Sequence, residues 1–457
     1  MIKRIVATLV AALLLTVSFA VSAEEAADGT IAKPVITSGN TIAIYNIETK
    51  TYVFNTSNNK RIEPASTAKM ITAMLAYDSI PNLQEPITAP SNVSSATLIG
   101  PLGSKGAPRL GIGAGETYTA YELLQAAVIT SANDACVCLA DYVSGGDLTA
   151  FVQKMNDKAK QIGAVNTHFT SCTGLAGEGA YTTAEDVALI ASVFYQYSML
   201  FDIARVDRAT TSLGTLHTKN YFNSNYLLAD YYKYSKKGVI GISAGQNTDT
   251  SGYALVSAVT TSNKLTYIVV VMEAASEIRD AQTGVRSFPE ENAYADTVVL
   301  SEWLPGAFRT QTAVSLKETF YELPVELGID SDSIIIVPEH EVTILRDLSI
   351  GAENNIELKP MFGYSKLTAP VEKDMLVGEL KVYYNGTLID SVPLLTHNTV
   401  EKSDLLELAH KFKSALFSDT AMTVYRIFFI IVIAFVAISV CSFVYRCVRK
   451  YSKGLKG

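Results

Sequence analysis

Residues 64–73 have the sequence Pro-Ala-Ser-Thr-Ala-Lys-Met-Ile-Thr-Ala, which combines a helix start with two side chains that can react together. The proline and the small residues after it predict a helix from Thr67 to about Tyr77. Positions three apart share a helix face, so Ser66 and Lys69 should lie side by side. A serine hydroxyl is a weak nucleophile until a base takes its proton, and a lysine with a depressed pKa can be that base. Taken alone, the tetrad also fits a serine that caps a helix beside a solvated lysine.

A second polar motif, Ser131-Ala132-Asn133, falls in a predicted break between two helices. The first helix begins at the capping-box sequence of residues 119–122 and ends near Thr130, and the second begins around Asn133. A connector of this kind can project polar side chains into a cleft, where Ser131 can relay a proton and Asn133 can hold a substrate amide. Without other motifs, a turn with local caps is the simpler interpretation.

A third segment, Gly241-Ile242-Ser243-Ala244-Gly245, fits the G-x-S-x-G pattern in which α/β-hydrolases carry their nucleophile. That pattern needs a helix directly after the serine, whereas the residues from Gln246 to Gly252 are typical of a turn. We therefore reject an esterase nucleophile at Ser243 as the main interpretation. A glycine-rich strand edge is the competing structural explanation.

The remaining patterns divide the chain into two folded regions. Short β-type runs precede the helices, and two Val- and Ile-rich runs, Tyr253–Thr260 and Thr266–Met272, follow them and should lie centrally in a sheet. We predict one mixed α/β (α+β) domain over about residues 25–308. Residues 316–397 show short β-type runs between polar turns, which predicts a small all-β domain.

Both ends of the chain predict contact with a membrane. Lys3 and Arg4 precede an apolar run, and small residues up to Ala23 are typical of a cleavage site, so residues 1–23 are predicted to be a signal peptide, with an uncleaved anchor as the alternative. Residues 427–445 carry no charge and are long enough to cross most of a hydrocarbon core. A basic tail, residues 446–457, follows and is expected in the cytoplasm. Residues 401–425 are predicted to be an amphipathic juxtamembrane segment.

Composition excludes several other classes of protein. The chain has 457 residues, 48% of them hydrophobic, so it is not a disordered chain. It carries 37 Lys and Arg against 45 Asp and Glu, which argues against a large nucleic-acid surface. Cys136 and Cys138 point to different faces of a predicted helix and are not expected to pair. The usual zinc patterns are missing, and we predict no metal or other cofactor.

Taken in order, the three motifs resemble those of the D-alanyl-D-alanine carboxypeptidases, the low-molecular-mass penicillin-binding proteins of the serine peptidase S11 type. That family carries S-x-x-K, then S-x-N, then K-T-G. Further similar runs lie over about residues 30–400, among them Thr130–Ala135, Thr173–Leu175, Tyr181–Asp186, Leu367–Val371 and Val377–Leu380. The resemblance implies a penicillin-binding/β-lactamase-like transpeptidase domain, then a small all-β domain and one C-terminal transmembrane helix.

The resemblance also implies a mechanism. Ser66 would attack the peptide bond between the terminal D-alanines of a peptidoglycan stem peptide, Lys69 would accept its proton, and Ser131 would pass a proton to the leaving D-alanine. Asn133 would hold the substrate, and the N–H groups of Ser66 and Gln246 would form the oxyanion hole. Water would release the acyl-enzyme, and β-lactams would acylate the same serine. A single-pass cell-membrane protein with an extracytoplasmic catalytic domain suits such an enzyme of cell-wall maturation.

The chain departs from the family at the third motif. Ser243-Ala244-Gly245 stands where the family has Lys-Thr-Gly, so the glycine is kept and the lysine charge toward the substrate carboxylate is lost. A charge-assisted hydrogen bond is worth about 1.5–3 kcal/mol, so the loss costs roughly 10- to 150-fold. The family's carboxylate-binding arginine has Arg286 as its nearest counterpart and Arg279 as a weaker one; a solvated surface arginine is the alternative for each.

Two main hypotheses follow from this departure. The first is an active carboxypeptidase with an altered carboxylate pocket. The second is an impaired relative that binds wall peptides or partner proteins without efficient turnover. An esterase that uses Ser243 is a third and lesser one.

Overall fold

A computed structural model of the chain describes residues 31–454, except 38–39, 101–106, 176, 212–218, 246–251, 275–277, 280–285, 288 and 354. The chain divides into two compact units. The first contains the residues up to Gln311 together with Leu345–Asn354, and the second contains Thr312–Ile344 and the residues from Asn355 onward. The predicted signal peptide, residues 1–23, lies outside the described residues.

A five-stranded antiparallel sheet runs through the first unit in the order β2-β1-β9-β8-β7. Its strands are β1 (Thr41–Asn46), β2 (Thr51–Asn55), β7 (Val239–Gly245), β8 (Tyr253–Thr260) and β9 (Thr266–Ala274). The Val- and Ile-rich strands β8 and β9 occupy inner positions, as their sequences predict. Gly245, the last residue of the edge strand β7, pairs with Ala254.

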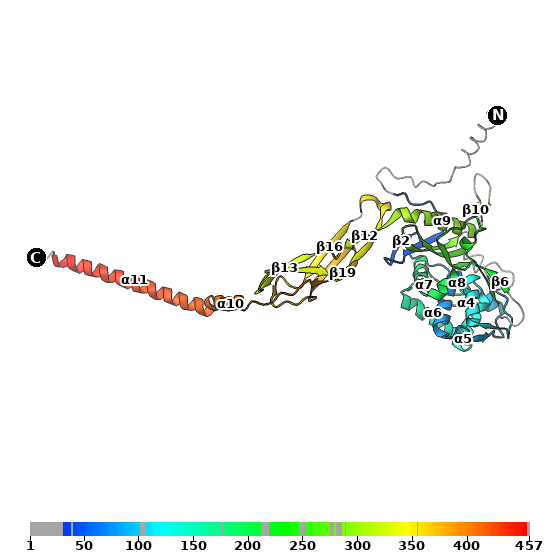
Figure 1. The fold of residues 1–457 in the computed structure, drawn as a ribbon, viewed down its shortest axis with the longest axis horizontal. Coiled ribbons are helices and arrows are strands. Elements are labelled where there is room, and N and C mark those ends of the chain that lie inside the picture. The colour runs from blue at the N-terminus through cyan, green and yellow to red at the C-terminus, as the bar shows by residue number, and fades with distance from the viewer. Residues whose placement is uncertain are drawn as a thin grey trace, which may run out of the picture. The chain divides into compact units, whose positions relative to one another are not determined.

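Helices cover both faces of this sheet (Figure 1). One face packs on α2 (Ala68–Ser79), α4 (Ala120–Ile129), α5 (Asn133–Ser144), α6 (Leu148–Ile162), α7 (Ala184–Gln196) and α8 (Ser198–Ala204), and the other packs on α9 (Pro289–Ala307). Successive strand residues alternate between the two cores, so Val256 of β8 faces the larger group of helices and Leu255 faces α9. Burial on both faces explains why β8 and β9 are hydrophobic throughout.

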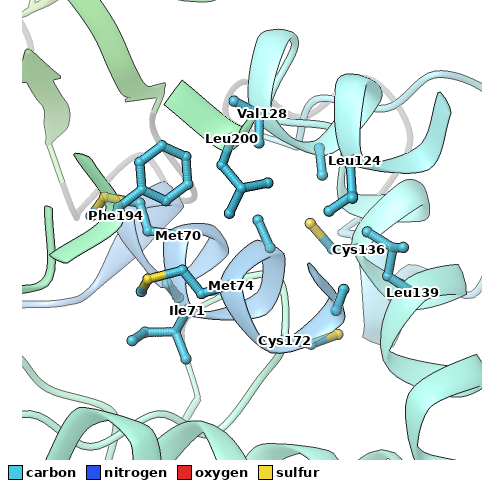
Figure 2. Close-up of a cluster of buried hydrophobic side chains, with 14 of the residues drawn as sticks. Met70, Ile71, Met74, Leu124, Val128, Cys136, Leu139, Cys172, Phe194 and Leu200 are labelled. Carbon is cyan, nitrogen blue, oxygen red and sulfur yellow. The ribbon is translucent and has the colours of Figure 1, made fainter. Parts of the chain in front are cut away.

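Local signals set the helices that border the site. Thr119 and Glu122 form the predicted capping box at the start of α4, and α4 ends at Ile129, just before the connector that carries Ser131. A 3₁₀ turn, η1 (Ala65–Thr67), precedes α2, so the predicted helix start at Thr67 lies one residue before the α-helix itself. Figure 2 shows the core behind this region, with α2 side chains packed against those of α4, α5 and α7: Met70, Met74, Leu124, Val128, Cys136 and Phe194.

Shorter elements complete the first unit. They are β3 (Pro86–Thr88), α3 (Ala96–Ile99), β4 (Thr117–Thr119), β5 (Arg208–Thr211), β6 (Lys219–Phe222), η2 (Tyr226–Leu228), β10 (Ile278–Arg279), β11 (Arg286–Ser287) and η3 (Leu348–Glu353).

The second unit is built from strands, as predicted. Its main sheet has the order β16-β18-β19-β14-β13-β17. The strands are β13 (Tyr321–Glu326), β14 (Ser333–Pro338), β16 (Ile356–Phe362), β17 (Leu367–Thr368), β18 (Leu376–Tyr384) and β19 (Thr387–Thr396), while β12 (Phe308–Val314) and β15 (Val342–Asp347) pair separately. An α/β unit followed by an all-β unit confirms the predicted fold class.

Two helices follow the β sheet. Ser403 caps α10 (Asp404–Leu416), and α11 (Asp419–Gly454) begins three residues after α10 ends. The predicted juxtamembrane segment 401–425 is therefore divided, because its last residues belong to the long helix. Within α11, Asp419–Arg449 is long and apolar enough to cross a membrane, and it contains the predicted span 427–445.

Candidate active site

The structure brings the first two motifs together in one buried cluster. Lys69 Nζ lies 3.2 Å from Ser66 Oγ and 2.9 Å from Ser131 Oγ. Ser66 is in the 3₁₀ turn before α2, Lys69 is in the first turn of α2, and Ser131 is in the connector between α4 and α5. Ser66 is 0% exposed and Lys69 4% exposed, so the lysine is not the solvated side chain that the tetrad alone allowed.

Burial makes Lys69 a stronger candidate for a general base. Desolvation lowers the pKa of Lys69 from 10.5 to about 8, because the charged ammonium loses its hydration in the interior. The nearby thiols of Cys136 and Cys172 would oppose this shift in the pKa of Lys69 only as thiolates, and no described carboxylate contributes. Burial also raises the pKa of Cys172 to about 12 and that of Cys136 further, so both thiols stay neutral around neutral pH. A lysine in this setting can accept a proton from a serine hydroxyl.

Strained backbone holds the two serines in place. Ala65, directly before Ser66, has φ +49°, and Ser131 has φ +58°, which are left-handed conformations that non-glycine residues seldom adopt. Strain of this kind persists only where the surrounding structure enforces it, and it concentrates at functional sites. The carbonyl group of Ala65 packs against Gly174, where a Cβ would lie 1.9 Å from the Ala65 oxygen. Gly174 is therefore a positioning residue for the Ser66 turn.

Strand β7 approaches Ser66 from the other side. Ser243 Oγ donates a hydrogen bond to the backbone oxygen of Ser66 at 3.2 Å. Gly245 has φ +145°, and a Cβ there would lie 2.6 Å from Ser66 Oγ, so glycine is required for the strand to lie this close. Ser243 lies within the strand and pairs with Val256, whereas an esterase nucleophile would stand on a strand-to-helix turn. This geometry removes the argument for an esterase.

The side chain of Asn133 is held by one hydrogen bond, and its Oδ1 atom remains available to a ligand. It is fully buried at the start of α5, its Nδ2 donates to the Ile99 oxygen at 3.0 Å, and its backbone N–H donates to Pro108 at 2.7 Å. Asn133 Oδ1 has no hydrogen-bond partner among the described residues. A buried amide oxygen without a partner is costly unless a ligand supplies a donor. Its orientation therefore fits a substrate N–H.

Asp134 fixes the loop beside Asn133. Its carboxylate accepts hydrogen bonds from the backbone N–H groups of Leu110, Gly111 and Ile112 at 2.7–2.9 Å. The described hydrogen bonds of Asp134 all come from backbone N–H groups, so Asp134 supports the site and does not serve as an acid. Neither Asp134 nor Gly174 is assigned a role by sequence motifs, although both stand inside runs that resemble the carboxypeptidase family. Their roles become visible only in the structure, because each acts through a contact with a segment distant in the sequence.

Two predicted site residues are not tested by the structure. Gln246 lies outside the described residues, so its part in an oxyanion hole remains a prediction. Arg286 lies in β11 and pairs with Arg279 of β10, and its side chain also lies outside the described part. Among the described residues, no group of three or more His, Cys, Asp or Glu is placed to hold a metal ion.

Models of two protein families match the chain. The D-alanyl-D-alanine carboxypeptidase model matches residues 28–276, and the model of the penicillin-binding protein 5 C-terminal domain matches residues 308–402. Together they cover most of the α/β unit, without α9, and the strands of the all-β unit.

Individual relatives agree with these families. D-alanyl-D-alanine carboxypeptidase DacF of Bacillus subtilis is 24% identical over 88% of this chain and 96% of its own length. DacC of Escherichia coli is 26% identical over 75% of this chain and 80% of its own length. Among solved structures, penicillin-binding protein 5 of Haemophilus influenzae shares the fold, with a TM-score of 0.61 and 23% identity over 81% of this chain and all of that one. The Streptomyces K15 DD-transpeptidase gives a TM-score of 0.51 and 25% identity over 60% of this chain and all of that one.

Proposed function

Because the chain belongs to the family of D-alanyl-D-alanine carboxypeptidases, we propose that Ser66, Lys69 and Ser131 carry out its serine-peptidase reaction. The protein is a serine hydrolase of the cell wall that removes a terminal D-alanine. One observation carries the assignment of residues: Lys69 Nζ lies within hydrogen-bond distance of both serine hydroxyls in a buried site. No other described lysine is placed between two serines in this way.

Acylation follows from the order of these contacts. Neutral Lys69 takes the proton of Ser66 Oγ as that oxygen attacks the carbonyl carbon of the penultimate D-alanine. The resulting ammonium is 2.9 Å from Ser131 Oγ, which can hand a proton to the departing amine and receive one from Lys69. The C–N bond then breaks and leaves an ester on Ser66. Water attacks this ester and Lys69 accepts the water's proton. The ester C–O bond then breaks, Lys69 returns the proton to Ser66 Oγ, and free Ser66 and neutral Lys69 are restored.

Substrate positioning is divided between two elements. Asn133 Oδ1 is the acceptor for a backbone N–H of the stem peptide, since it is buried and has no partner among the described residues. Gly245 allows the substrate to lie against β7 next to Ser66. The N–H groups of Ser66 and Gln246 complete the proposal as the oxyanion hole. β-Lactams, whose amide mimics the cleaved bond, should acylate Ser66 by the same route.

The cellular arrangement is part of the same proposal. Helix α11 fits a membrane anchor. The cations that follow the apolar span, among them Arg446 and Arg449, favour a cytoplasmic C-terminus. The α/β unit then faces the wall side of the membrane, where stem peptides are found.

Penicillin labelling tests the residue assignment. The full chain in detergent is treated with a fluorescent penicillin, and intact-mass spectrometry measures the adduct. We expect one adduct on the wild type and none on Ser66→Ala or Lys69→Ala. Ser301→Ala is the matched control and should label normally, because the hydroxyl of this buried serine bonds to the Val298 oxygen within α9, away from the described site.

The same experiment separates the alternatives. A wild type that binds muropeptides but forms no adduct would support an impaired relative. The loss of turnover would then be attributed to Ser243, which stands where the family has a lysine. An adduct that survives Ser66→Ala would refute Ser66 as the nucleophile.

A further inference from the structure

Lys69 lines a small cavity. Its volume is about 10 Å³, and its walls come from α2, α4, α7, β7 and the connector after α4. Lys69, Ser131 and Ser243 form its polar side. Met70, Val128 and Phe194, which belong to the buried cluster in Figure 2, form much of its apolar side.

One N–H donor of the Lys69 ammonium has no partner among the described residues. A lysine ammonium has three N–H donors, and the neutral amine has two donors and a lone pair. Among the described residues, only the hydroxyls of Ser66 and Ser131 are within hydrogen-bond distance of Lys69 Nζ. Buried polar groups are nearly always fully paired, with protein or with ordered water. The hydroxyls of Ser131 and Ser243 also have more hydrogen-bonding capacity than the one bond that each makes with the described residues.

The size of the cavity limits what can occupy it. A cavity needs roughly 10–15 Å³ to hold one water, and that water needs two to four polar partners. This cavity reaches the lower limit and offers three polar side chains, so it fits one water. A monovalent cation of similar size would sit beside the ammonium of Lys69 in its charged state, whereas a water is compatible with both states of the lysine.

We propose that this cavity is a hydration site for a single water molecule that bonds Lys69 Nζ and the hydroxyls of Ser131 and Ser243, and that supports the protonated state of Lys69 during catalysis. The proposal rests on the proposed function, in which Lys69 gains and loses a proton in each half-reaction. In the protonated state the water accepts the third N–H of the ammonium. In the neutral state the lone pair faces the Ser66 hydroxyl, and the water accepts one of the two remaining N–H groups, a weaker hydrogen bond than the one from the ammonium.

The water should therefore set the pH at which Lys69 becomes a base. Removal of a partner from the ammonium favours the neutral amine, so the pKa of Lys69 should fall when the cavity is filled. The other titratable groups that face Lys69 are Cys136 of α5 and the loop residue Cys172. Burial raises the pKa of both thiols, so they stay neutral where Lys69 titrates. The hydroxyls from the connector and from β7 do not titrate in this range.

Filling the cavity with a matched pair of variants tests the proposal. Ala127→Val adds two methyl groups to a residue that lines the cavity, while Ala126→Val adds the same groups to its buried neighbour on α4, which does not line it. The second-order rate of β-lactam acylation of the full chain is measured from about pH 6 to 10. We expect Ala127→Val to move the acid limb of this profile down by about one pH unit, as the loss of a hydrogen bond to a charged group implies.

The outcomes are separable. General damage from overpacking lowers the rate at all pH values in both variants and leaves the limb in place. An acid limb that stays in place in an acylated Ala127→Val variant overturns the proposal. If the wild type is not acylated at any pH, the proposed function fails, and the water is judged by structure alone.

A crystal structure of the full chain in detergent supplies that second readout. We expect density for one water in the wild-type cavity and none in Ala127→Val. A wild-type cavity without density overturns the proposal even where the variants fail to fold. Density whose strength follows the ammonium concentration of the crystals also overturns it, since the occupant would then be a cation.

Discussion

Replacement of Gly174 by alanine should disable the nucleophile from a distance. Gly174 has φ +75°, and a Cβ built on it would lie 1.9 Å from the Ala65 oxygen and 2.9 Å from the Ala65 carbonyl carbon. Neither neighbour is a flexible side-chain end. The loop around Gly174 is also tied to α2, because the Thr72 hydroxyl donates to the Cys172 oxygen at 2.7 Å. The Ala65 carbonyl must therefore move, and Ser66 moves with it.

A second glycine separates the two costs of this substitution. Gly179 has φ +82°, but a Cβ there meets no atom within 4 Å. Gly179→Ala should therefore cost only the left-handed backbone, about 1 kcal/mol. Gly174→Ala adds an overlap with a packed backbone, for which a further 1–3 kcal/mol or so is typical. A nucleophile displaced by about 1 Å loses roughly 100-fold in rate.

The assay compares both variants with the wild type. Stopped-flow kinetics with a fluorescent penicillin give the acylation rate of the full chain, and thermal unfolding gives stability. We expect Gly179→Ala to acylate like the wild type and Gly174→Ala to acylate about 100-fold more slowly, with noncovalent binding of the penicillin less affected than the acylation step. If Gly174→Ala is destabilised yet acylates as fast as Gly179→Ala, the claim that this glycine positions Ser66 is wrong.

Three further predictions follow from the site. Acylation of the wild type should rise with pH with a midpoint near 8, because the neutral form of Lys69 is the base and its pKa is lowered to about 8; a profile flat across that range would contradict this. Asp134→Ala should lower the free energy of unfolding of the α/β unit by about 3 kcal/mol in denaturant titrations, since charged hydrogen bonds to three backbone N–H groups are lost. Ser243→Lys should raise kcat/KM on a D-Ala-D-Ala peptide by roughly 10- to 150-fold, whereas a fall would show that Ser243 is an adapted group.

Local periodicity was sufficient to predict the reactive pair. Ser66 and Lys69 meet because they are three residues apart, across the 3₁₀ turn and the first turn of α2, a spacing that places both side chains on one face. The connector with Ser131 could be predicted because the capping box at Thr119 and the break after α4 are local signals. The buried strands β8 and β9 were recognisable from continuous Val and Ile, since both of their faces are covered.

Features that depend on contacts between segments distant in the sequence could not be predicted in the same way. Gly174 acts on Ala65 through a contact between distant segments, and nothing near either residue signals it. The unpaired Oδ1 of Asn133 depends on Ile99 taking the Nδ2 group, which is a tertiary contact. The segment 401–425 divides at Phe417 and Ser418, where α10 ends and the Ser418 hydroxyl accepts from the Ala421 N–H at 3.2 Å at the start of α11.

The burial of Lys69 is itself a test of the enzymatic interpretation, because a buried ammonium without a carboxylate partner opposes folding. A pKa lowered from 10.5 to about 8 corresponds to about 3 kcal/mol lost below pH 8, where the unfolded chain and the folded site are both protonated. Since the unfolded state binds more protons between the two pKa values, stability should rise with pH through this window. Lys69→Met removes that dependence but leaves two serine hydroxyls without the amine, at about 1 kcal/mol each.

We therefore expect Lys69→Met to abolish acylation and to be more stable than the wild type by about 1 kcal/mol at neutral pH, with the advantage shrinking and reversing as the pH rises toward 10. The difference between the two unfolding profiles isolates Lys69, because all other titrating groups are common to both proteins. An advantage independent of pH would show that the amine is not buried as the structure has it. A chain that only bound wall peptides would lose nothing by this substitution, whereas a peptidase must retain the destabilising lysine because its neutral amine is the base.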